Sequence, residues 1–180
     1  MKFYLESLGC PKNLVDAQGM TRLLERLGHE PVAEPEQAQI LLVNTCGFIE
    51  DAREESLRSL QDLAESKRPD QFLVATGCLS QHWGMSLDER IPGLDAMLGT
   101  RRWSEIGSLV QGLLTGGDRH REQPMHLLGD PLIGGAHGAD RYAIQGASAY
   151  LKIADGCNAP CAFCAIPLIK GPAASRPAGD

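Results

Sequence analysis

The strongest constraint on the fold is a pair of short, continuously apolar runs with a helical pattern between them. Residues 39–45 and 72–76 have too few polar positions for strands with one face in water, so they predict strands buried on both faces. Residues 50–66 place leucines on one side of a helix and charges on the other. Strands that alternate with helices build mostly parallel sheets covered by helices. The sequence therefore predicts an α/β fold, a three-layer sandwich with a mostly parallel sheet.

Weaker patterns extend this prediction over residues 1–115, the first expected domain. Asn13 is expected to be the N-cap of a helix that ends near Gly28. Further strands are expected at residues 2–8, 29–32 and 96–98, and further helices at residues 13–27, 81–90 and 104–114.

The composition changes after residue 115. Residues 116–147 are rich in glycine, proline and histidine and have no clear period, which predicts an interdomain linker with one short element. Residues 148–154 then predict a strand that ends near Gly156 and opens a second domain, residues 148–180.

Three cysteines follow that strand in one short loop, at the spacing C-x3-C-x2-C: Cys157, Cys161 and Cys164. Four-iron clusters are normally held by four thiolates, so three suggest a cluster with one iron open to a small molecule. A zinc site would need a fourth ligand nearby, and the nearest histidine, His137, lies upstream across the linker. Three closely spaced thiols cannot all pair with one another, and no segment indicates secretion, so disulfides are disfavoured. The spacing favours an iron–sulfur cluster.

The other three cysteines share one context. Cys10, Cys46 and Cys78 each stand just past an expected strand and beside a glycine. The carboxyl ends of neighbouring parallel strands form one edge of a sheet, where ligands gather. A free cysteine is also a common small core residue, so structural cysteines are the alternative. The repeated position favours a second three-thiolate site.

Composition limits the partners and the compartment. Of 180 residues, 43% are hydrophobic and 22% charged, and no apolar run approaches the roughly 20 residues of a membrane helix. Glu6 interrupts the place where a signal peptide would have its apolar core. We expect a cytoplasmic protein with no membrane partner. The net charge of −6 argues against nucleic-acid binding through this part of the protein and suits a basic protein partner.

The cysteine motifs carry a family resemblance. The loop at residues 157–164, with Phe163 before its last cysteine, resembles the signature of radical S-adenosylmethionine enzymes. Three further stretches resemble the cysteine motifs of the methylthiotransferase family: Ser7-Leu8-Gly9-Cys10-Pro11-Lys12-Asn13, Asn44-Thr45-Cys46-Gly47-Phe48-Ile49 and Thr76-Gly77-Cys78-Leu79. That family joins an amino-terminal α/β domain to a radical S-adenosylmethionine barrel and a small β-barrel, the TRAM domain. Residues 148–180 would then supply the first strand and cluster loop of the barrel.

The resemblance implies two 4Fe-4S clusters and S-adenosyl-L-methionine as cofactors. Cys157, Cys161 and Cys164 would hold the cluster that binds S-adenosylmethionine, and Phe163 would shield it or contact the adenine. Cys10, Cys46 and Cys78 would hold an auxiliary cluster that carries the sulfur. No residue of the chain is assigned a catalytic role of its own, because the cofactors carry the difficult chemistry. A flavodoxin or ferredoxin would supply electrons.

The resemblance also indicates a branch of the family. Gly9-Cys10-Pro11-Lys12-Asn13 is typical of the RimO branch, which methylthiolates the β-carbon of an aspartate in the twelfth protein of the small ribosomal subunit. The tRNA branch usually has a Gly-Cys-Gln-Met-Asn type sequence there. A tRNA methylthiotransferase, a non-catalytic iron–sulfur electron carrier and a zinc-stabilised module remain alternatives. Because the sequence stops at Asp180, before most of the barrel, we expect a truncated form that is inactive alone.

Overall fold

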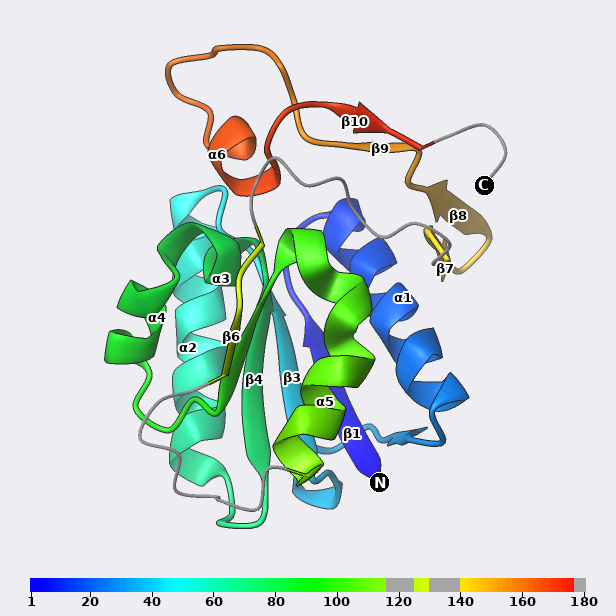
Figure 1. Cartoon of the computed structure of the whole chain (residues 1–180), viewed down its shortest axis with the longest axis vertical. Coiled ribbons are helices and arrows are strands. Elements are labelled where there is room, and N and C mark those ends of the chain that lie inside the picture. The colour runs from blue at the N-terminus through cyan, green and yellow to red at the C-terminus, as the bar shows by residue number, and fades with distance from the viewer. Residues whose placement is uncertain (116–124, 130–139, 177–180) are drawn as a thin grey trace.

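A parallel sheet of six strands, in the order β2-β1-β3-β4-β5-β6, forms the centre of the structure (Figure 1). The structure is a computed structural model, and it describes residues 1–115, 125–129 and 140–176. The predicted α/β architecture with a mostly parallel sheet is confirmed. The strands are β1 (Lys2–Ser7), β2 (Glu30–Pro31), β3 (Ile40–Thr45), β4 (Phe72–Gly77), β5 (Ala96–Gly99) and β6 (Met125–Leu127).

Helices cover both faces of this sheet (Figure 1). One face packs against α1 (Pro11–Arg26) and α5 (Ile106–Thr115), and the other against α2 (Glu50–Ser66), α3 (Cys78–Trp83) and α4 (Met85–Arg90). Two short 3-10 helices, η1 (Pro35–Gln37) and η2 (Thr100–Glu105), complete this part.

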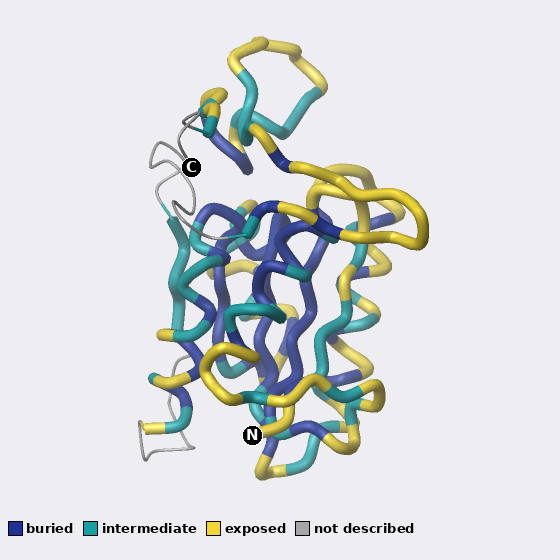
Figure 2. Tube along the Cα trace, turned by 90° about the vertical axis from the view of Figure 1, so that its right-hand side faces the viewer, coloured by how far each residue is buried: buried dark blue, intermediate teal, exposed yellow. Residues whose placement is uncertain are grey.

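Strand β3 shows why the apolar runs predict the layers. All six of its residues are buried. Ile40 and Leu42 enter the core under α1 and α5, whereas Leu41 and Val43 enter the core on the α2 side. Successive side chains of a strand point to opposite faces, so a strand covered on both faces is apolar except where, as at Asn44 and Thr45, a buried polar side chain is hydrogen-bonded. Figure 2 shows this buried interior in dark blue.

Three helix predictions need correction. Helix α1 begins at Pro11 with Cys10 as its N-cap residue, so Asn13 lies within the first turn and is not the cap. Proline is favoured at the first helical position, because it has no N–H to leave unpaired. The helix predicted at residues 81–90 is divided into α3 and α4 at Gly84, where φ is +49°. The helix predicted at residues 104–114 begins as η2 and continues as α5.

The segment after residue 140 lies across the carboxyl end of the sheet (Figure 1). An antiparallel hairpin of β7 (Tyr142–Gln145) and β8 (Ser148–Leu151) comes first. The short strands β9 (Ala154–Asp155) and β10 (Ala174–Ser175) then pair antiparallel, with helix α6 (Ile166–Lys170) between them. The strand predicted at residues 148–154 is confirmed over residues 148–151, as β8, but it is not continuous to residue 154. It is interrupted between β8 and β9, where Lys152 turns its side chain into the protein toward Asp16.

Strands β6 and β7 fall within residues 116–147, which were expected to form a linker with one short element. Strand β6 pairs in parallel with β5 and forms the edge of the main sheet. Over the three described ranges, no helix is both long and apolar enough to cross a lipid bilayer.

Candidate functional site

Three strand ends bring Cys10, Cys46 and Cys78 together at the carboxyl edge of the sheet. Strands β1, β3 and β4 are neighbours, and one cysteine follows the end of each. All three cysteines line one cavity of about 360 Å³. Cys46 and Cys78 are each only 6% exposed, whereas Cys10 is exposed. The remaining lining residues are Gly9, Lys12, Phe48, Ile49, Ala52, Ile166 and Lys170.

Glycines allow the strand ends to approach this closely. Gly9 has a φ of +87°, and a Cβ atom there would lie 2.7 Å from the Cβ and 2.9 Å from the Sγ of Cys46. Gly77 has a φ of +97°, and a Cβ atom there would lie 2.5 Å from the carbonyl oxygen of Thr45. Both positions combine a backbone conformation that favours glycine with a lack of room for a side chain. Larger residues would push the cysteine-bearing loops apart.

Asn13 joins these loops from inside the first turn of α1. Its Nδ2 donates to the carbonyl oxygens of Leu8, at 2.9 Å, and Thr45, at 3.0 Å. Its Oδ1 accepts from the Cys78 thiol at 3.6 Å. The side chain therefore connects the loops after β1 and β3 to the third cysteine. Sequence reasoning assigned Asn13 to a helix cap, although Pro11 marked an earlier helix start.

Ser56 holds the backbone of Cys46 from α2, on the face of the sheet opposite to α1. Its hydroxyl accepts from the backbone N–H of Cys46 at 2.9 Å and donates to the carbonyl oxygen of Ala52 at 2.8 Å. Ser56 is fully buried in α2. Sequence reasoning missed it, and the available signal was a serine on the apolar side of an otherwise charged helix.

A buried lysine borders the same cavity. Lys170, the last residue of α6, donates from its Nζ to Asp16, at 3.4 Å, and to the Thr100 hydroxyl. Burial acts to lower the pKa of Lys170, but Asp16, Cys78 and Asp155 outweigh it, so the pKa lies above its ordinary value. Burial raises the pKa of the Cys78 thiol, and the nearby Lys170 opposes that rise.

The loop with the other three cysteines is held at its base. Gly156 has a φ of +77°, and a Cβ atom there would lie 2.1 Å from the carbonyl oxygen of Pro172. The backbone N–H of Cys157 donates to the carbonyl oxygen of Gly171 at 3.0 Å, and that of Cys164 donates to Cys161 at 3.1 Å. Cys157 and Cys164 are half-buried and Cys161 is exposed.

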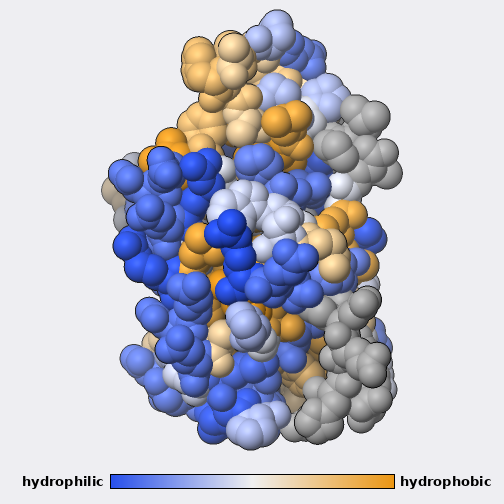
Figure 3. Space-filling view, turned by 90° about the vertical axis from the view of Figure 1, so that its left-hand side faces the viewer, coloured by the Kyte–Doolittle hydropathy of each residue, from blue (hydrophilic) through white to orange (hydrophobic). Residues whose placement is uncertain are grey.

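Phe163 lies in this loop and is 90% exposed. Its ring therefore has little contact with the described part of the chain. Figure 3 shows apolar side chains gathered at the end of the molecule that carries this segment. Leu168 in α6 is exposed as well. His82 is exposed on α3, as the sequence indicates.

The number and kind of donor atoms can be compared with what a four-iron cluster requires. Among the described residues, no three His, Cys, Asp or Glu side chains converge closely enough to bind one metal ion. A four-iron cluster makes a different demand, because each thiolate binds its own iron and the sulfurs lie further apart. Three thiols around a cavity of about 360 Å³, with lysines on its wall, fit that demand. Three thiols within one short loop also fit it.

The end of the loop that carries Cys157, Cys161 and Cys164 lies near the first set of cysteines. Ile166 stands two residues after Cys164 and lines the cavity of Cys10, Cys46 and Cys78. Two residues of chain span at most about 7 Å, so the end of the cysteine loop lies beside that cavity.

Comparison with known proteins agrees with these motifs. The model of the "Uncharacterized protein family UPF0004" matches residues 2–99, more than half of the chain. A "Ribosomal protein uS12 methylthiotransferase RimO" from Herpetosiphon aurantiacus is 43% identical over 205 aligned positions, covering 100% of this chain and 43% of the relative. The protein of that name from Chloroflexus aurantiacus is 44% identical, covering 99% of this chain and 41% of the relative. The one from Myxococcus xanthus is 39% identical, covering 98% of this chain and 36% of the relative.

The chain thus spans about two fifths of the length of the curated relatives it matches. The family match includes all three strand-end cysteines, and the matches to the relatives extend over the cysteine loop as well. The chain belongs to the protein family UPF0004, and over nearly its whole length it resembles the RimO methylthiotransferases.

Proposed function

We propose that this chain provides the two cluster-binding sites of a radical S-adenosylmethionine methylthiotransferase that modifies an aspartate of ribosomal protein uS12. One observation carries the proposal: two sets of three thiols lie at the same end of the sheet, and the second set leads directly into the cavity of the first. Three thiolates leave one iron of a four-iron cluster without a protein ligand. Two such clusters at the same end of the sheet suit a reaction that needs both a radical source and a sulfur donor.

Each set has a distinct task in this proposal. Cys157, Cys161 and Cys164 would hold the cluster that binds S-adenosylmethionine, and their exposed loop leaves room for that molecule. Cys10, Cys46 and Cys78 would hold the auxiliary cluster in the more enclosed cavity. When bound, the clusters and S-adenosylmethionine supply the radical and sulfur-transfer chemistry.

The chain's own residues orient and enclose the auxiliary site. Asn13 and Ser56 hold the backbone around Cys10 and Cys46 through hydrogen bonds to Leu8, Thr45 and Cys46. Phe48 and Ile49 line the cavity and limit the access of water. Lys170 places a positive charge beside thiols that would lose their protons and become thiolates when they bind iron.

Anaerobic reconstitution followed by iron and sulfide counting tests the proposal. We expect about eight irons in the parent chain, and about four in each of two variants. One variant replaces Cys10, Cys46 and Cys78 with alanine, and the other replaces Cys157, Cys161 and Cys164. His82→Ala, which removes an exposed histidine near Cys78, is the matched control and should retain eight. Added S-adenosylmethionine should change the spectrum only where the loop cysteines are intact.

Other outcomes separate the alternatives. A colourless protein that contains zinc would refute the cluster assignment. Clusters with spectra that do not respond to S-adenosylmethionine would indicate an electron carrier. For the substrate, we expect the reconstituted chain to retain uS12 in preference to tRNA, because its net charge of −6 repels a phosphate backbone. Preferential retention of tRNA would favour a tRNA methylthiotransferase. The proposed reaction also needs an electron donor, for which a cytoplasmic flavodoxin or ferredoxin is suited.

A further inference from the structure

Four charged side chains form a buried network between α1 and the segment that carries the cysteine loop. Lys152 Nζ lies 2.6 Å from Asp16 Oδ1 and 2.6 Å from Asp155 Oδ2. Lys170 Nζ lies 3.4 Å from Asp16 Oδ2 and 3.8 Å from Asp155 Oδ1. Asp16, Lys152 and Lys170 are 1%, 5% and 3% exposed. The Asp155 side chain is 13% exposed, so the network contains two ammonium groups and one carboxylate with almost no access to water, and a second carboxylate that is partly exposed.

The network brackets the cysteine loop. Asp155 precedes Cys157 by two residues, and Lys170 follows Cys164 by six. Lys170 contacts Asp16 of helix α1 directly, and Asp155 is joined to Asp16 through Lys152 and Lys170. Lys170 has further anchors in η2, since its Nζ donates to the Thr100 hydroxyl and its carbonyl oxygen accepts from Arg101.

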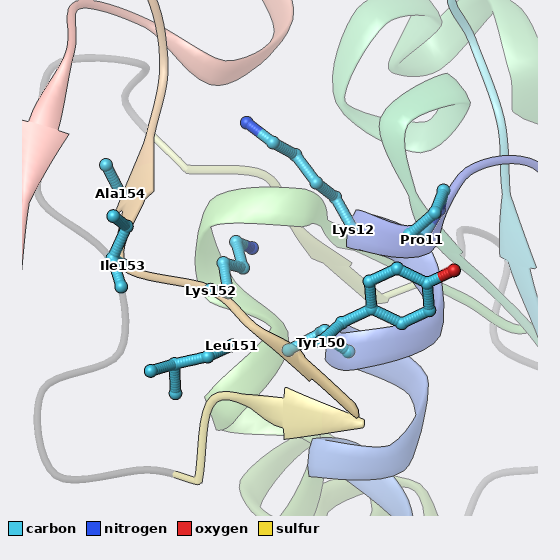
Figure 4. A pocket seen from close by; sticks show the side chains of 8 residues that line it. Pro11, Lys12, Tyr150, Leu151, Lys152, Ile153 and Ala154 are labelled. Carbon is cyan, nitrogen blue, oxygen red and sulfur yellow. The ribbon is translucent and has the colours of Figure 1, made fainter. Parts of the chain in front are cut away.

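A second cavity shows how the same segment lies along α1. It has a volume of about 300 Å³ and is lined by Pro11, Lys12 and Val15 of α1 and by residues 150–154 (Figure 4). Lys152 borders this cavity, while its ammonium group reaches the buried Asp16. The segment is therefore only partly packed against the helix, and the ion network is its most buried attachment there.

Lys170 also faces the other cysteines. It lines the cavity of Cys10, Cys46 and Cys78, and it does so as a buried charge. Lys12 lines that cavity as well, but it is exposed. The field of a buried charge is weakly screened by water and salt, whereas the field of an exposed charge is strongly screened.

We propose that Lys170 is a positioning residue that acts on both cysteine sites. Held by Asp16, it fixes the loop of Cys157, Cys161 and Cys164 against the cavity of the first three cysteines. It also supplies the buried positive charge that stabilises the reduced, more negative state of a cluster in that cavity. The second part rests on the proposed function, and the first part does not.

Hydrogen exchange on the iron-free chain tests the positioning part without any cofactor. In Lys170→Met and Asp16→Asn, we expect backbone amides of residues 157–171 to exchange at least tenfold faster than in the parent. Amides of residues 40–45 should stay protected, which shows that the sheet is folded. Lys170→Arg keeps the charge and should preserve most of the protection. Unchanged exchange at residues 157–171 in both of the first two variants would overturn the positioning role.

The reduction potential of the auxiliary cluster tests the electrostatic part. It is measured with Cys157, Cys161 and Cys164 replaced by alanine, so that only one cluster can form. Lys170→Met should lower the potential by about 59 mV or more, a tenfold change for one electron. Lys170→Arg should leave it nearly unchanged, and the matched control Lys12→Met should shift it much less.

The results distinguish the two proposals. Equal shifts in Lys170→Met and Lys12→Met, or no shift in either, would overturn the electrostatic role of Lys170. If the parent binds no cluster while Lys170→Met still accelerates exchange at residues 157–171, the proposed function fails and the positioning role is supported.

Discussion

The substitution Asp16→Asn tests the buried network most directly. Asp16 accepts from Lys152 at 2.6 Å and from Lys170 at 3.4 Å, and it is 1% exposed. The substitution leaves two buried ammonium groups with only one carboxylate, Asp155. Asparagine can replace one of the two contacts through its Oδ1, but its Nδ2 cannot accept a hydrogen bond. The remaining change is an uncompensated positive charge in the interior.

The expected loss of stability is large. Removing one partner of a buried ion pair costs about 3–5 kcal/mol. The lower end applies here, because Asp155 remains close to both lysines and one hydrogen bond survives. A loss of about 3 kcal/mol, with a urea slope of about 2 kcal/mol/M, moves the unfolding midpoint by about 1.5 M.

Equilibrium urea unfolding, followed by circular dichroism, measures this shift. The matched control is Asp140→Asn, which removes an aspartate that pairs with Arg22 and Arg26 at a more exposed site. Each exposed pair contributes at most about 1 kcal/mol, so loss of both pairs in the control should move the midpoint by less than about 1 M. A shift for Asp16→Asn no larger than that of the control would refute the conclusion that this network is shielded from water.

Three further perturbations test other parts of the structure. Gly77→Ala should reduce the free energy of unfolding by about 1–3 kcal/mol or more, because it adds strain at a φ of +97° and a clash with Thr45. Gly28 has a φ of +83° and nothing within 4 Å of an added Cβ atom, so Gly28→Ala should reduce the free energy of unfolding by less in the same urea titration. Asn13→Ala should lower the free energy of unfolding by about 1–3 kcal/mol for each of the two carbonyl groups that lose the hydrogen bond from Nδ2. A loss under about 1 kcal/mol would contradict the bridging role of Asn13. Burial, followed by the N-terminal amine, lowers the pKa of His29, so the folded state prefers the neutral ring. Stability should therefore fall as the pH drops from above 6.5 toward the folded pKa of His29, and His29→Gln should remove that part of the pH dependence.

Much of the α/β core could be predicted from local patterns. The runs that became β3 and β4 are apolar over their first four residues, and the charges of α2 mark its exposed side. These signals are strong because burial on two faces leaves little choice of residue. The meeting of Cys10, Cys46 and Cys78 follows from topology, since neighbouring parallel strands end at the same edge.

The features that were missed depend on distant partners. Lys170 and Asp16 are separated by 154 positions, and neither has a local pattern that marks it as buried. A lysine at the end of a short helix is ordinarily an exposed residue that favours the helix terminus. Strand β8 ends just before Lys152, whose ammonium group binds Asp16 in α1. This end of the strand also depends on a partner far away in the sequence. Local sequence patterns describe which side chains need burial, but they do not identify a partner so far along the chain.

The network also raises the question of why charges, and not apolar side chains, join α6 to α1. Apolar residues of similar size would often give equal or greater stability than a buried ion network. They would also permit several packing arrangements, whereas two lysines between two aspartates accept few geometries. A variant in which Asp16, Lys152, Asp155 and Lys170 are all replaced by leucine or methionine separates these contributions. We expect its free energy of unfolding to match or exceed that of the parent, with residues 157–171 less protected from exchange than in Lys170→Arg. A variant that keeps both stability and protection would mean that simple apolar packing can position the loop, and that the lysine is retained only for its charge.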